Sequence, residues 1–134
     1  MNTILEILLL TVLLSPLLLF DSWVKRRRRK SLPSISDSDF LAEFDTAEDE
    51  QEILKARELI SKEIYFPKDK LHPKHDIRAI QTRYSPVTLG DLGISDLYDD
   101  LYLDAKSKGV ELTEYPETVK GYIEMYLRYS DRSD

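Results

Sequence analysis

Residues 4–24 read ILEILLLTVLLSPLLLFDSWV, and the six residues that follow, 25–30, read KRRRRK. A helix needs about 20 mostly apolar residues to cross the hydrocarbon core of a bilayer, and residues 4–24 supply that length. Trp23 lies near the end of this stretch, where an aromatic anchor at the membrane interface is expected. The pattern predicts a transmembrane anchor over residues 1–24.

The charges on either side of this apolar stretch predict whether it is cleaved and how it is oriented in the membrane. A cleaved signal peptide carries its positive charges before the apolar run, whereas this chain has no Lys or Arg before residue 25. By the positive-inside rule the basic run at 25–30 stays in the cytoplasm, where it contacts anionic lipid headgroups rather than nucleic acid. We therefore expect a single-pass protein of the cell (inner) membrane, with the N-terminus outside and the C-terminal domain cytoplasmic.

The composition excludes several classes of enzyme. The chain has no cysteine, so disulfides, thiolate nucleophiles and cysteine-based zinc sites are excluded. Its four glycines form no phosphate-binding motif. His72 and His75 lie on either side of Pro73 without a third nitrogen ligand, so we predict no metal site. Without a nucleophile–base pair, a metal set or a cofactor cradle, the sequence predicts a protein that is not an enzyme.

Beyond the anchor, the chain divides into a basic cluster with a linker at 25–39 and an acidic domain at 40–134. Pro33 and the serines around it disfavour regular structure in the linker. Subtracting the six basic residues at 25–30 and the two acidic residues before them from totals of 19 and 25 leaves 13 basic and 23 acidic residues. The resulting net charge of −10 repels nucleic acid and anionic lipid and suits a basic surface of a protein partner.

The domain shows one clear helical pattern in its first half. Thr46 precedes acidic residues at the start of the run 48–65, as a helix N-cap does. Apolar residues then recur every three or four positions, and they are Ile53, Ala56, Ile60 and Ile64. From 66 to 87 the periodicity disappears and three prolines interrupt the chain, so this segment is predicted to be a long loop.

Two further helices are predicted in the second half. Ser95 is expected to cap the first of them, and Gly109 follows its end. The residues on its buried face are Leu97, Leu101 and Ala105. The second helix opens at Pro116 and runs to about Arg128. With no alternating strand pattern, the sequence predicts an all-α fold, a small three-to-four-helix bundle preceded by one N-terminal transmembrane helix.

An ordered set of short motifs spans about residues 50–128. The set consists of Leu71-His72-Pro73 with Asp76, Asp91-Leu92-Gly93, Ser95-Asp96-Leu97, Gly109-Val110-Glu111-Leu112 and Thr118-Val119. In this order and spacing the domain resembles the acyl carrier protein family. The resemblance implies a bundle of acyl-carrier-like type, with a short helix near 113–117 and a serine at the start of the second helix that carries a phosphopantetheine arm.

The motif that would carry the arm departs from the family pattern. Where the family has Asp-Ser, this chain has Ser95-Asp96, so the arm-bearing position holds a carboxylate that cannot be pantetheinylated. Ser95 lies one residue earlier, and as an N-cap it would use its hydroxyl to bind backbone N–H groups. Two interpretations follow: a degenerate carrier fold that lost its arm and serves as a binding module, or attachment of phosphopantetheine to Ser95 in a shifted register.

Three functional hypotheses arise. The first is a non-catalytic, membrane-anchored docking module that binds a basic protein partner at the cytoplasmic membrane face, a lipid-metabolism enzyme being one candidate. It needs no cofactor, and its docking residues are Asp96, Asp99, Asp100 and Asp104. The second is a tethered acyl carrier with phosphopantetheine on Ser95, for lipid or polyketide-type synthesis. The third is an unrelated small helical membrane adaptor.

Overall fold

The computed structural model describes residues 2–45, 49–85 and 90–130. Its helices are α1 (Thr3–Lys30), α2 (Asp37–Leu41), α3 (Glu50–Glu63), the 3-10 helix η2 (Lys68–Lys70), α4 (Ile77–Tyr84), α5 (Gly90–Ser107) and α6 (Val119–Tyr129). No strand occurs in the described ranges, which contain an isolated bridge between Asp76 and Thr118. The prediction of an all-α fold is confirmed. Thr46, predicted as a helix cap, lies outside the described residues.

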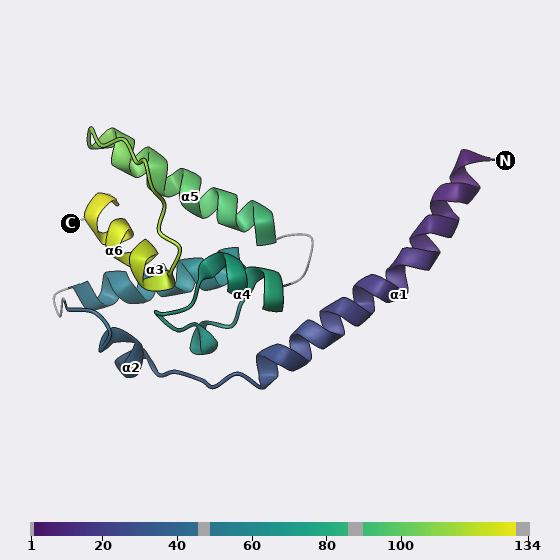
Figure 1. Ribbon diagram of the computed structural model, residues 1–134, viewed down its shortest axis with the longest axis horizontal. Helices are drawn as coiled ribbons and strands as arrows, with labels where there is room; N and C mark the ends of the chain where they lie inside the picture. The colour runs from purple at the N-terminus through teal and green to yellow at the C-terminus, as the bar shows by residue number, and fades with distance from the viewer. Residues whose placement is uncertain (1, 46–48, 86–89, 131–134) are drawn as a thin grey trace.

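α1 is a single helix that contains both the apolar stretch and the basic run. Its 28 residues give a length of about 42 Å, because each helical residue adds about 1.5 Å. Figure 1 shows α1 projecting away from the bundle, and its large apolar side chains from Ile4 to Phe20 are exposed. The prediction of one N-terminal helix that is long and apolar enough to span a membrane is confirmed. The basic run, which the sequence groups with the linker, continues the helix to Lys30.

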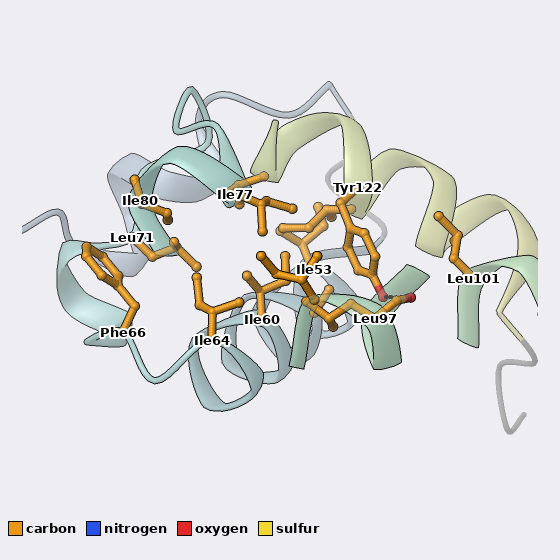
Figure 2. Packing of buried hydrophobic residues seen from close by; sticks show 14 of the residues in the cluster. Ile53, Ile60, Ile64, Phe66, Leu71, Ile77, Ile80, Leu97, Leu101 and Tyr122 are labelled. Carbon is orange, nitrogen blue, oxygen red and sulfur yellow. Dashed lines mark hydrogen bonds between the residues drawn. The ribbon is translucent and has the colours of Figure 1, made fainter. Parts of the chain in front are cut away.

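The core of the bundle forms around α3, against which α5 and α6 pack. The predicted stripe is confirmed, since Ile53, Ala56 and Ile60 on α3 and Ile64 directly after it are fully buried. Figure 2 shows this stripe facing side chains from the segment that follows α3 and from α4, α5 and α6. The largest contributors include Ile53, Ile60, Ile64, Leu71, Ile77, Leu97, Leu101 and Tyr122. Burying each such side chain stabilises the fold by about 1.5–3 kcal/mol, so this cluster holds the helices together.

The prediction of a long loop over 66–87 is wrong, because the segment carries η2 and α4. Asp76 caps α4, and its Oδ1 accepts a hydrogen bond from the Ala79 N–H at 2.8 Å. Ile77 and Ile80 then enter the core from the helix. α4 has only eight residues, and its two buried isoleucines are too few to reveal a helical period in the sequence.

The prediction that Ser95 caps the following helix is also wrong. α5 begins at Gly90, five residues earlier, and places Ser95 in its second turn. The cause lies at Gly93, where an added Cβ would come within 1.9 Å of the carbonyl oxygen of Glu63. Gly93 therefore lets α5 cross close to the C-terminal end of α3 and is not a break before the helix. Gly109 follows the end of α5 as predicted, with the left-handed φ of 76° that favours glycine.

The last helix and the segment before it also differ from expectation. α6 begins at Val119, three residues after the predicted opening at Pro116. Its cap is Thr118, whose Oγ1 accepts a hydrogen bond from the Gly121 N–H at 3.0 Å. The segment between α5 and α6 forms no helix, so the short helix near 113–117 implied by the resemblance does not form. With α4 as an additional helix before α5, the acyl-carrier-like type of bundle is not confirmed.

Candidate functional site

The four predicted docking residues lie together on the outer side of α5. They are Asp96, Asp99, Asp100 and Asp104, and successive members are adjacent or three to four residues apart, which brings them to one side of a helix. Asp96, Asp99 and Asp100 are exposed, and Asp104 is half-buried. The opposite side of α5 enters the core. The structure therefore gathers the four carboxylates on a single surface.

Leu103 belongs to the same surface, although the sequence reasoning did not identify it. Its side chain is 58% exposed among the four aspartates, and we call these five residues the acidic face of α5. A groove of about 310 Å³ beside it lies between α3, α5 and α6, lined by Leu59, Asp100, Leu101, Leu103, Asp104, Tyr122 and Tyr126. Leu103 and the groove together give the acidic face apolar contact area beside its charged side chains. In the sequence, Leu103 lies out of phase with the buried residues Leu97, Leu101 and Ala105 of α5, and this is the signal that could have identified it.

A larger cleft, of about 620 Å³, opens at the edge of the acidic face. It lies between α4, α5 and the segment that leads into α6, and its lining residues are Asp76, Arg78, Ile94, Ser95, Tyr98, Asp99, Tyr115, Pro116 and Glu117. The hydroxyl of Tyr98 donates a hydrogen bond to the carbonyl oxygen of Pro116 at 2.8 Å. Burial raises the pKa of Tyr98 above its ordinary value, so the hydroxyl stays protonated and keeps this donor. The cleft thus has a fixed aromatic wall.

Ser95, the candidate attachment residue, lies at the rim of this cleft. Its side chain is exposed, and because it is not an N-cap its hydroxyl is not committed to the start of the helix. The physical objection that the sequence raised against Ser95 is therefore removed by the structure. Asp96 follows it on the exposed side of α5.

The two histidines lie side by side in the turns before α4, with ring centroids 5.9 Å apart. Nδ1 of His75 accepts a hydrogen bond from the backbone N–H of His72, and Nδ1 of His72 accepts one from the backbone N–H of Lys74, both at 3.1 Å. Burial and then the neighbouring His72 lower the pKa of His75 below its ordinary value. The two rings thus hold this turn as hydrogen-bond acceptors, a structural role.

The buried Lys25 joins α1 to the domain. Its Nζ donates a hydrogen bond to the carbonyl oxygen of Ser85 at 3.0 Å and pairs with Asp21 at 3.4 Å. The hydroxyl of Ser85 donates in turn to the carbonyl oxygen of Ile64, just beyond α3. A buried ammonium is strongly destabilising unless it has such partners. Lys25 therefore attaches α1 to the bundle and does not simply add a charge to the basic run.

The C-terminal end of α1 makes two further contacts with the domain. Nη1 of Arg29 donates to the carbonyl oxygen of Tyr65 at 3.3 Å, and Nζ of Lys70 donates to the carbonyl oxygen of Arg29 at 2.6 Å. Cations favour this end of a helix because its last carbonyl groups lack helical partners. The basic residues left exposed on α1 are Arg26, Arg27, Arg28 and Lys30.

The linker is held against the domain by the buried side chain of Arg57. Nη1 of Arg57 pairs with Asp37 at 2.7 Å, and Nη2 donates to the carbonyl oxygens of Ile35 at 3.0 Å and Leu71 at 3.3 Å. The guanidinium also lies over the ring of Phe40, 4.3 Å from its centroid. Because α1 and the linker are both attached, the domain is held directly beside the basic end of α1.

Comparison of the chain with protein-family models, with curated proteins and with solved structures finds no match. The resemblance to acyl carrier proteins therefore stays a prediction from the sequence.

Proposed function

We propose that this protein is a non-catalytic, membrane-anchored docking module that captures a basic protein partner at the cytoplasmic face of the cell membrane. The observation that carries the proposal is the acidic face of α5, on which the four aspartates surround the exposed Leu103. An apolar centre supplies contact area, and the charged rim selects the partner and accelerates its approach.

The charge distribution supports this choice of partner. The chain from residue 31 onward carries a net charge of −10, while residues 25–30 are all basic. An acidic domain beneath an anionic leaflet is repelled by the lipid, so the acidic face is suited to a protein and not to the membrane itself. The exposed arginines at the end of α1 suit the lipid headgroups instead.

The attachment of α1 supports a fixed presentation of the acidic face. Lys25 and Arg29 bind the domain within the last two turns of the helix, immediately after the apolar stretch. A domain attached in this way stays near the membrane surface with a constant orientation. The partner is therefore expected at or in the membrane. The proposal does not depend on an acyl-carrier-like fold and applies equally to an unrelated helical adaptor.

The docking face can be tested by reversing two of its charges, Asp96→Lys with Asp100→Lys, neither of which lines the large cleft. A photo-crosslinking residue in place of Leu103 in the full chain reports on the partner in the membrane. We expect the reversal to reduce crosslinking by about tenfold or more, because like charges across an interface cost several kcal/mol. Raising the salt concentration is expected to weaken capture by the unreversed protein.

The matched control reverses two exposed carboxylates on α3, Glu50→Lys with Glu58→Lys, and so changes the net charge equally. It should leave the crosslinked product intact. If both variants lost the crosslinked product to the same extent, capture would depend on the total charge of the domain, and the acidic face would not be the docking site.

A second candidate function is favoured by one observation, the exposed Ser95 at the rim of a cleft. In that case the protein is a tethered acyl carrier with phosphopantetheine on Ser95, acting in lipid or polyketide-type synthesis. An intact mass of the full chain after co-expression with a broad-specificity phosphopantetheinyl transferase separates the two functions. The docking module predicts an unmodified mass. A mass gain equal to the arm, lost in Ser95→Ala and kept in Ser107→Ala, would instead identify a carrier.

A further inference from the structure

The large cleft between α4, α5 and the segment before α6 shares Asp99 with the acidic face. We propose that this cleft binds the side chain of a lysine or arginine of the partner that docks on the acidic face. The inference rests on the proposed function for the source of that side chain, and it assigns the cleft as the anchor point of the interface.

The aromatic walls of the cleft suit a cation. The rings of Tyr98 and Tyr115 meet edge to face, with centroids 5.4 Å apart and planes at 66°. Tyr98 is fixed by its hydrogen bond to Pro116, whereas Tyr115 is 44% exposed and presents ring surface to a ligand. Ammonium and guanidinium groups bind to the faces of such rings. Tyr98 lies on α5 and Tyr115 lies in the segment between α5 and α6, so the two rings come from different parts of the chain.

The carboxylates around the rings come from three separate elements. Asp76 lies at the start of α4, Asp99 on α5 and Glu117 before α6. Burial is the main cause that raises the pKa of Tyr98; the charge of Arg78 acts to lower this pKa, and the charges of Asp76 and Glu117 act to raise it. A cation in the cleft would therefore meet negative charge on several sides, a more specific arrangement than the single row of aspartates on the acidic face.

Arg78 is the cationic side chain among the lining residues, and it makes the direction of charge preference testable. Three carboxylates outnumber this one guanidinium, so the cleft favours a cation overall. Arg78 weakens that preference by like-charge repulsion. If the cleft instead bound an anion, the guanidinium of Arg78 would be the main group that attracts this anion. Removing Arg78 is thus expected to strengthen binding of a cation and to weaken binding of an anion.

The probe is N-acetyl-arginine amide, with N-acetyl-citrulline amide as the neutral match of nearly equal shape. The full chain is placed in phosphatidylcholine nanodiscs, whose zwitterionic lipid does not compete for the probe, and its tyrosine rings are labelled with carbon-13 for NMR. Among the eight tyrosines, the signal of Tyr115 is assigned with Tyr115→Phe. We expect the arginine probe to shift the Tyr115 signal saturably and the citrulline probe to leave it unchanged.

Variants at exposed positions then test the contacts without disturbing the core. Glu117→Gln and Tyr115→Ala are each expected to weaken binding by about 2- to 5-fold, with the Tyr98 signal as the readout in the second case. Arg78→Gln is expected to strengthen binding by about 2- to 5-fold. Glu111→Gln removes a carboxylate from the same segment but outside the cleft and should change nothing.

The inference is overturned if the citrulline probe shifts Tyr115 equally, if Arg78→Gln weakens binding, or if no saturable shift occurs. Its failure can be told apart from failure of the docking proposal. If the Asp96 and Asp100 variant loses the crosslink but the probe does not bind in the cleft, the acidic face is supported as the docking site and the cleft is refuted as the anchor point. If the probe binds in the cleft but the crosslink survives the reversal, the cleft is supported and the acidic face is refuted as the docking site.

Discussion

Replacing Gly93 with alanine is expected to lower the free energy of unfolding of the bundle by about 3 kcal/mol, near the upper end of the usual cost of overpacking. An added Cβ would lie 1.9 Å from the carbonyl oxygen and 2.7 Å from the carbonyl carbon of Glu63. Both atoms are backbone, so no change of rotamer relieves the clash. α3 and α5 must separate, and the apolar core that includes Ile64 and Ile94 would loosen with them.

The measurement is thermal unfolding of the full chain in detergent, followed by near-ultraviolet circular dichroism at a wavelength where the packed tyrosines contribute, none of which lies on α1. A loss of about 3 kcal/mol corresponds to a fall in midpoint of roughly 12–24 °C for a domain of this size. Gly109→Ala is the control, because its Cβ meets no atom within 4 Å and only the left-handed backbone is strained, at about 1 kcal/mol. If the Gly93→Ala protein unfolded at the same midpoint temperature as the unaltered protein, the close crossing of α3 and α5 would be contradicted.

Arg57→Ala is expected to lower the free energy of unfolding by about 2–4 kcal/mol. The Arg57 guanidinium is almost fully buried and makes three hydrogen bonds, of which those to Asp37 and Ile35 hold the linker and α2 on the domain. Hydrogen bonds to charged groups contribute about 1.5–3 kcal/mol each, although solvent partly replaces them where the linker opens. The variant also loses the packing of the guanidinium on the ring of Phe40.

Limited proteolysis, together with the same thermal measurement, checks this expectation. Cleavage within residues 31–41 should become faster in Arg57→Ala before the bundle itself unfolds, because the released segment is no longer held. Asp37→Asn is expected to cost less than about 1 kcal/mol, since the side chain of Asp37 is 56% exposed. Arg128→Ala, at an exposed position of α6, serves as the control. Linker cleavage at the same rate in Arg57→Ala and Arg128→Ala would show that Arg57 does not hold this segment.

Local patterns identified the parts of the fold that depend on one helix at a time. The stripe of α3 is visible in the sequence because Ile53, Ala56 and Ile60 follow the helical period over 14 residues. The same reasoning placed the four aspartates on one side of α5, since the spacing of side chains on a helix does not depend on its neighbours. The apolar length of α1 is likewise a local property.

Other parts of the fold depended on residues far apart in the chain. Gly93 has the appearance of a helix break in the sequence, and only the position of Glu63, thirty residues earlier, shows that it is a contact between two helices. Lys25 is one of six consecutive basic residues, and only the packing of α4 against α1 distinguishes it from the others. In both cases the deciding partner lies outside any local window.

The sequence by itself determined that this protein is all-helical, that its first helix can span a membrane, and that its domain is acidic with a row of carboxylates on α5. These properties follow from composition and from the period of the α-helix, which each segment carries alone. The tertiary structure decided where α5 begins, which basic residues bind the domain, and that Tyr98, Tyr115 and Glu117 line one cleft with Asp99. Side chains from separate elements meet only when the core is packed, because burial of apolar surface, and not local preference, sets how the helices cross.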